Sequence, residues 1–180
     1  MSSKKNSLFR LVLAAMLLAL ALVLPLLTGQ LKELGNAFCP MHLPVLLCGF
    51  FCGPWYGLAV GAIAPLLRFV LFGMPPVIPI GIAMAFELAT YGLVSGLLWR
   101  ILRGKPYGVF VALIAAMLAG RAVWGAVRLV LYGLGKSEFS WALFLSGAFT
   151  SAIPGIAIQL VLIPVLVLTL TKLFPRLKPV

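Results

Sequence analysis

The sequence has very few residues that could hold a metal or act as an acid or base. Its 180 residues contain three glutamates, no aspartate, one histidine and three cysteines. Metal centres held by carboxylates, two-metal phosphoryl transfer and aspartyl catalysis therefore lack their usual ligands. Cys48 and Cys52 fall in an apolar run, and an odd cysteine count argues against a disulfide framework. We interpret both as small buried hydrophobic side chains and expect no metal and no cofactor.

Apolar residues dominate what is present. They make up 63% of the chain, whereas charged residues make up 9% and give a net charge of +11. Such a composition lies far outside the range of soluble domains. Nucleic-acid binding requires a solvated basic face on a polar scaffold, so the basic balance indicates lipid headgroups rather than nucleic acid. The chain is therefore predicted to be an all-α integral membrane protein.

Six apolar segments predict a bundle of six transmembrane helices that forms a single domain over residues 1–180. Gly53-Pro54 separates a short second helix from the third. The last apolar stretch is too long for one straight crossing and carries Pro154-Gly155, so we expect a re-entrant or surface piece before its final span. Residues 8–174 should form the bundle, with cytoplasmic tails at 1–7 and 175–180. The segments are expected at 8–28, 40–52, 54–72, 79–100, 107–132 and 152–170.

The distribution of lysine and arginine predicts that both termini are cytoplasmic. With the N-terminus inside, only Lys32 and Lys136 fall in outer loops, as the positive-inside rule requires. Trp99 and Trp141 are placed like interfacial anchors. A signal peptide is the alternative for the first segment, but its apolar run is too long, and we expect it to be retained. The nine inner cations are Lys4, Lys5, Arg10, Arg100, Arg103, Lys105, Lys172, Arg176 and Lys178.

Three arginines and one glutamate lie inside the predicted spans. An ionisable side chain in the bilayer costs at least about 2.5 kcal/mol, so such residues usually face protein or a water-filled cavity. The helix rise places all four in the outer half of the membrane. Polar and aromatic residues that share a helix face with these four residues extend the set. The planar guanidinium groups of arginines beside a tryptophan suit a ligand with a carboxylate or phosphate group. The predicted substrate-binding residues are His42, Arg68, Glu87, Thr90, Tyr91, Arg121, Trp124, Arg128 and Gln159.

Each of these residues also has a structural interpretation. Glu87 can pair with one arginine as a helix-packing salt bridge, and Arg128 can reach the outer interface. His42 begins the second helix and suits a hydrogen-bonded gate or a surface position as well as a ligand contact. Gln159 suits either a cavity wall or a hydrogen bond between helices. One ion pair still leaves surplus positive charge, which favours an anionic ligand.

Three pairs of small residues follow the spacing that lets helices approach closely: Ala15 and Ala19, Gly57 and Gly61, Gly92 and Gly96. We expect two of these pairs to serve internal packing. Gly135-Lys136-Ser137 resembles the end of a phosphate-binding loop, but position 130 is valine where that pattern requires glycine. We therefore expect no ATP hydrolysis by this chain alone.

Five blocks of the sequence match a known family: PMHLPVLLCG at 40–49, GPWYG at 53–57, APLLR at 64–68, GMPP at 73–76 and MAFELATYG at 84–92. With these blocks, nearly the whole chain resembles the substrate-specific S component of an energy-coupling factor (ECF) vitamin transporter, of the folate/pantothenate-type group. The resemblance implies a bacterial, multi-pass plasma-membrane subunit, not an enzyme. It implies that Ala15 and Ala19 dock on a transmembrane scaffold subunit that works with two ATPases. It also implies a vitamin substrate, for which pantothenate is the first choice and folate the second.

Other functions remain open at this point. The chain could be a self-sufficient small membrane carrier, or an S component for a neutral vitamin such as riboflavin. The absence of tandem related halves argues against the carrier. An intramembrane hydrolase using Ser146 or Ser151 needs a nearby base, and His42 has no acid at a suitable spacing.

Overall fold

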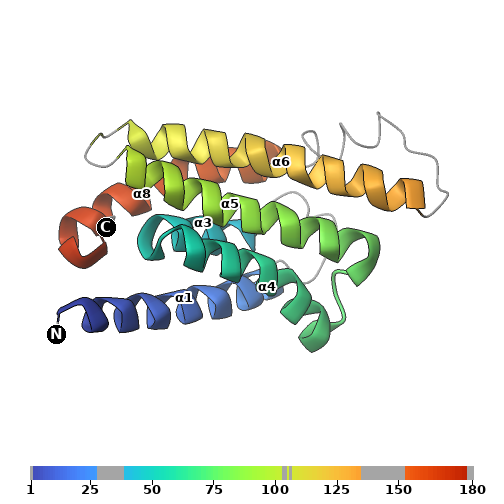
Figure 1. Ribbon diagram of the computed structural model, residues 1–180, viewed down its shortest axis with the longest axis horizontal. Coiled ribbons are helices and arrows are strands. Elements are labelled where there is room, and N and C mark those ends of the chain that lie inside the picture. Colours follow the sequence, from blue (N-terminus) through green and yellow to red (C-terminus); the bar gives the residue numbers. More distant parts are fainter. Residues whose placement is uncertain (1, 28–38, 103–104, 106, 135–152, 178–180) are drawn as a thin grey trace.

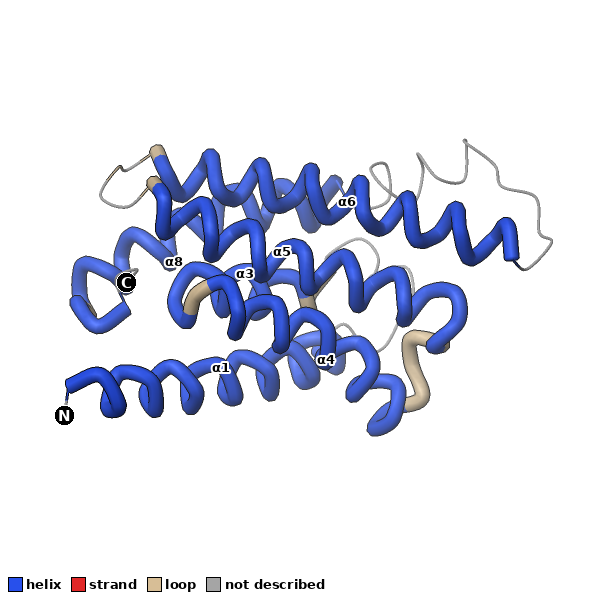
Figure 2. The backbone as a smooth tube through the Cα atoms, in the orientation of Figure 1, coloured by secondary structure: helices blue, strands red, loops and turns tan. Residues whose placement is uncertain are grey.

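The computed structural model describes residues 2–27, 39–102, 105, 107–134 and 153–177, and these residues form helices joined by short connections (Figures 1 and 2). A π-helical turn, Val77–Gly81, precedes α5, and a 3-10 turn, Pro175–Leu177, follows α8. None of the described residues forms a strand. The α-helices are α1 (Ser2–Leu27), α3 (His42–Cys52), α4 (Pro54–Phe72), α5 (Ile82–Ile101), α6 (Gly108–Leu134) and α8 (Ile153–Leu173).

Five of these helices are long and apolar enough to cross a membrane, namely α1, α4, α5, α6 and α8, the span that includes α5 beginning at Val77. The sixth, α3, has 11 residues, and at 1.5 Å per residue it covers only about 16 Å. Each predicted segment therefore contains a helix, but the second is too short to span the hydrocarbon core alone. The re-entrant piece that was expected before α8 lies outside the described residues. The same holds for Trp141, Ser146 and Ser151.

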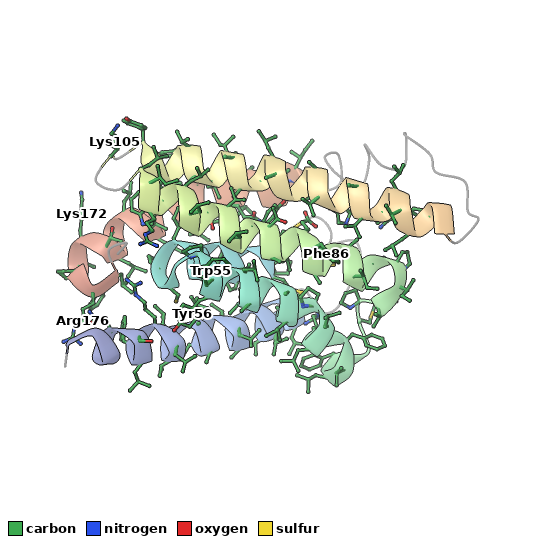
Figure 3. The ribbon with its side chains drawn as sticks, in the orientation of Figure 1. Trp55, Tyr56, Phe86, Lys105, Lys172 and Arg176 are labelled. Carbon is green, nitrogen blue, oxygen red and sulfur yellow. The ribbon has the colours of Figure 1, made fainter. Side chains whose placement is uncertain are left out.

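The long helices run side by side along one axis. In Figure 1, α6 lies above α5, α4 slopes downward below α5, and α1 lies at the lower left; the N and C labels stand at the same end. Figure 3 places Lys105, Lys172 and Arg176 at that end as well. We call it the terminal end of the bundle. The alternating directions expected for a multi-span bundle with both termini on one side are thus present.

Glycines allow α4 and α5 to pack with their backbones in contact. A Cβ on Gly57 would collide with the backbone of Gly92, and one on Gly61 would collide with the backbone of Leu88. At the other end of the contact, a Cβ on Gly96 would meet the backbone of Pro54. Two of the three small-residue pairs therefore serve packing inside the bundle, as predicted.

Glycine and proline also set the helix boundaries. Gly53, with φ at 102°, ends α3, and Pro54 opens α4 at a position where its missing N–H leaves no hydrogen bond unmade. Gly73, with φ at 71°, ends α4 in the same way. Pro154 lies in the first turn of α8, so Pro154-Gly155 begins this helix and does not interrupt it.

The helices α3 and α1 differ in how they meet the core. Ten of the 11 residues of α3 are buried, so this helix lies within the bundle. On α1, Ala14, Leu17 and Ala21 face the core, whereas Ala15 and Ala19 are exposed. The third small-residue pair therefore faces away from the other helices that the structure describes.

The interpretation of Trp99 as an interfacial anchor is wrong. Its side chain is 5% exposed and packs edge-on against Phe50, with ring centroids 6.0 Å apart. The exposed tryptophan at the terminal end is Trp55, at 74%.

Candidate functional site: a buried polar cluster around Glu87

Four polar side chains from α3, α5 and α6 meet in the bundle, and we call them the Glu87 cluster: Glu87, Tyr91, Arg121 and His42. The Glu87 carboxylate is 1% exposed. Its Oε1 accepts a hydrogen bond from the Tyr91 hydroxyl at 3.0 Å and lies 3.0 Å from Nη1 of Arg121. Nε2 of His42 lies 3.7 Å from the same oxygen. The helices α3, α5 and α6 therefore each contribute at least one predicted residue to this cluster.

Local sequence explains how the cluster is assembled. Glu87 and Tyr91 are four residues apart and so lie on one face of α5. Gly120 contacts the Tyr91 ring, which a Cβ at position 120 would strike, so α6 can approach closely and bring Arg121 to the carboxylate. His42 stands in the first turn of α3, and its ring centroid is 5.3 Å from that of Tyr91.

The contact between Glu87 and Arg121 is a buried ion pair. The side chains are 2% and 11% exposed, so each charge has been removed from water, and the pair remains stable only because the partner is in place. The structural interpretation of Glu87 is thus confirmed for Arg121, whose charge this carboxylate balances. His42 is 4% exposed, so its interpretation as a surface histidine is wrong.

Several nitrogens of the cluster lack hydrogen-bond partners within the part of the chain that the structure describes. They are Nδ1 and Nε2 of His42 and Nε of Arg121, all buried. The 3.7 Å separation of His42 from Glu87 is too long for a hydrogen bond. A buried polar group without a partner costs about 1–3 kcal/mol. The hydrogen-bonding capacity of these three nitrogens is therefore not met by the described residues.

Arg128 forms a second, partly exposed site on α6. Its guanidinium carbon lies 4.9 Å from the Trp124 ring centroid and 5.0 Å from that of Tyr132, and its Nη2 donates a hydrogen bond of 2.7 Å to the Tyr132 hydroxyl. Trp124 is 8% exposed. These three residues share one face of α6. It combines a planar cation with aromatic surface.

Arg68 does not contact the Glu87 cluster in the described structure. Its Nη1 donates a 2.9 Å hydrogen bond to the backbone carbonyl of Leu22 on α1, and its guanidinium lies 5.5 Å from the Phe72 ring centroid. Because Gly61 packs against Leu88, Arg68 lies about 10 Å further along the bundle axis than Glu87. The expected convergence of all three arginines on one hollow is not observed.

Thr90 and Gln159 complete the predicted set. The Thr90 hydroxyl donates a 2.8 Å hydrogen bond to the Phe86 carbonyl of its own helix. Gln159 is buried on α8, at 3% exposure. Neither has a contact with the Glu87 carboxylate among the described interactions.

Cys39 is a member of the site that the sequence did not reveal. Its Sγ is 4.0 Å from Nη2 of Arg121, and its carbonyl accepts a hydrogen bond from the His42 N–H. Burial raises the pKa of the Cys39 thiol, so the sulfur is neutral and does not balance the arginine charge. The sequence signal that could have indicated Cys39 is its position three residues before His42, a predicted site residue. No group of three potential metal ligands occurs within the described residues.

A cavity of about 150 Å³ lies elsewhere, at the terminal end of the bundle. Arg10 and Arg100 line it together with the residues around Gly53. It shares no lining residue with the Glu87 cluster. No substrate function was predicted for it from the sequence.

Comparison with known families identifies the class of the chain. The family model of the ECF transporter substrate-specific component matches residues 9–167, and the chain belongs to this family. It is therefore a substrate-binding membrane subunit that works with the other components of such a transporter, and not an enzyme. Searches of curated proteins and of solved structures gave no match.

Proposed function

We propose that this S component captures a small anionic vitamin, pantothenate first and folate second, from outside the cell. It delivers this cargo together with a transmembrane scaffold subunit and two ATPase subunits. The observation that supports the proposal best is the group of buried nitrogens around Glu87, in His42 and Arg121, that lack hydrogen-bond partners among the described residues. The oxygens of a carboxylate are suitable acceptors for the arginine donor.

The charge balance of the interior favours an acid over a neutral vitamin. Glu87 balances Arg121, and the Leu22 carbonyl accepts a hydrogen bond from Arg68. Arg128 contacts no carboxylate within the described part of the chain, and it lies between two aromatic rings. An anionic ligand at this side chain gains a charge-assisted hydrogen bond and aromatic contact together.

The cations of the terminal end support the proposed membrane orientation. Lysines and arginines concentrate on the cytoplasmic side of membrane proteins, and Lys105, Lys172 and Arg176 mark the terminal end in Figure 3. With this end in the cytoplasm of a bacterial cell, Glu87 lies about 20 Å along α5 from Arg100 and so in the outer half of the bilayer. The cluster then lies on the side from which the vitamin arrives.

The exposed small residues of α1 support docking on the scaffold. Ala15 and Ala19 face away from the core, and small residues let a second helix approach closely. Neither residue takes part in the Glu87 cluster. Scaffold docking and vitamin binding therefore use separate surfaces of the chain.

A matched pair of ligands tests the charge of the cargo. Pantothenate and the corresponding alcohol, in which a hydroxymethyl group replaces the carboxylate, are titrated into detergent-purified protein by calorimetry. Hydrogen bonds to charged groups contribute about 1.5–3 kcal/mol, so pantothenate should bind roughly 10- to 100-fold more tightly. Equal binding of both compounds would refute the anionic cargo, and mass spectrometry of the ligand that co-purifies would identify the replacement.

Two arginine variants separate ligand binding from packing. Arg128→Leu should weaken binding of the anion roughly tenfold or more and leave the unfolding temperature nearly unchanged, because this side chain is partly exposed. Arg68→Leu is the matched control, since Arg68 joins α4 to α1 and does not contact the Glu87 cluster. Arg68→Leu should lower the unfolding temperature clearly and leave the affinity for the anion nearly unchanged. If Arg68→Leu weakened binding of the anion and Arg128→Leu did not, the ligand would not bind at Arg128.

A further inference from the structure

We propose that the cavity at the terminal end binds the phosphate group of an anionic membrane lipid. This site is separate from the substrate site and does not depend on the proposed vitamin. It lies between α1, the junction of α3 and α4, and α5. Its volume is about 150 Å³, which gives room for several water molecules and hence for a phosphate group.

Two guanidinium groups give the cavity its charge. Arg10 from α1 and Arg100 from α5 both line it. Arginine binds phosphate through paired, parallel hydrogen bonds, and two arginines from different helices can hold one phosphate from two directions. The remaining wall is largely apolar and includes Phe50 and Phe51, which suits the region where a lipid headgroup meets its acyl chains.

The start of α4 adds backbone donors to the same wall. Gly53, Pro54, Trp55 and Tyr56 all line the cavity, and no side chain caps this helix. The first N–H groups of a helix have no partner within the helix, and the helix dipole favours an anion there. The two arginines and the N-terminus of α4 both favour a bound anion, and the cavity gives that anion room.

The depth of the cavity corresponds to the headgroup layer. Arg10, Pro54 and Arg100 each lie about 26 Å along their helices from the far helix end. This length is close to the hydrocarbon thickness of about 30 Å, so all three residues stand at one membrane boundary. Trp55, which is 74% exposed at the start of α4 (Figure 3), has the position of an interfacial tryptophan. A lipid phosphate is therefore present at this depth in any anionic bilayer.

The test measures lipid preference by thermal unfolding of the delipidated full-length protein in detergent. Phosphatidylglycerol, phosphatidylcholine and inorganic phosphate are added separately, and the concentration that gives half of the stabilisation is recorded. Each basic residue near an anionic membrane surface contributes roughly a fivefold change in binding. Wild type should therefore prefer phosphatidylglycerol over phosphatidylcholine, and Arg10→Gln/Arg100→Gln should lose about thirtyfold of its affinity for phosphatidylglycerol.

The control variant is Lys172→Gln/Arg176→Gln, which removes the same charge near the same end without altering the cavity wall. It should keep most of its affinity for phosphatidylglycerol, because neither side chain is among those that line the cavity and a single lipid in detergent presents no extended charged surface to them. If the double cavity variant does not fold, the single variants carry the test, each with about a fivefold loss.

Three results would overturn the proposal. Equal stabilisation by the two lipids, or a preference that survives loss of both cavity arginines, would exclude the site. Stabilisation by inorganic phosphate that removes the lipid effect would assign the cavity to a soluble anion.

Discussion

Replacement of Glu87 by glutamine tests whether the cluster is organised around a buried ion pair. The substitution keeps the side-chain size but removes the charge that lies 3.0 Å from Arg121. Removing one partner of a buried pair typically costs 3–5 kcal/mol, because the other charge is left without compensation. The amide oxygen still accepts a hydrogen bond from Tyr91, so we expect a loss of about 3 kcal/mol, at the lower end of this range.

A double-mutant cycle isolates the pair. Arg121→Met should also be destabilising, whereas Glu87→Gln/Arg121→Met removes both charges and should cost clearly less than the sum of the two single losses. Residues in one ion pair show interaction energies of about 0.5–3 kcal/mol, and this pair should lie near the upper limit. Denaturant unfolding in detergent, followed by far-ultraviolet circular dichroism, measures the four free energies.

The cycle also distinguishes packing from ligand binding. In Glu87→Gln the carboxylate no longer competes for Arg121, so an anionic ligand should bind at least as tightly as to wild type under conditions in which the variant is folded. Arg121→Met should bind it more weakly. If Glu87→Gln unfolds within about 0.5 kcal/mol of wild type, the range of ordinary surface substitutions, or if the two single effects simply add, the buried ion pair is refuted.

Three further predictions follow from the packing. Gly92→Val should be destabilising by about 3 kcal/mol or more, because a side chain there collides with the Gly57 backbone; unchanged unfolding would show that α4 and α5 do not touch. Ala15→Trp/Ala19→Trp should abolish assembly with the scaffold in co-purification while ligand affinity stays unchanged, since both residues are exposed; intact assembly would exclude this face. Tyr91→Phe should cost about 1–2 kcal/mol in unfolding experiments through its lost hydrogen bond, and a neutral effect would contradict the observed contact.

Most helix positions could be predicted because apolar length and Gly-Pro breaks are local signals. The third segment was expected at 54–72, and α4 spans Pro54–Phe72. The fourth was expected from 79, but a π-helical turn covers Val77–Gly81, and α5 begins at Ile82. The first was expected from 8, whereas α1 begins at Ser2. Polar residues can continue a helix beyond its apolar segment, so hydropathy alone does not mark this boundary.

The direction in which a side chain points was harder to predict than its depth. Trp99 and Trp55 both stand near the terminal end of the bundle, but Trp99 packs on Phe50 and Trp55 is exposed. Depth depends on the number of residues along one helix. Exposure depends on which neighbouring helix covers that face, and a single sequence without a known helix arrangement does not contain this information.

The three intramembrane arginines show why buried charge predicts a site without predicting each residue's part in it. All three are costly to bury, so each needs a partner. The partners are a backbone carbonyl for Arg68, a carboxylate for Arg121, and a hydroxyl between two aromatic rings for Arg128. The spacing from Arg121 to Arg128 placed two of them on one helix face. The partners, however, depend on how α4 meets α1 and how α6 meets α5. A glycine contact, that of Gly120 with the Tyr91 ring, fixes the register of α6 against α5. Glu87 therefore offsets only Arg121, and the surplus positive charge lies at Arg68 and Arg128. Of these two, Arg128 is the one beside aromatic rings and partly exposed, so we propose that a substrate carboxylate binds there first.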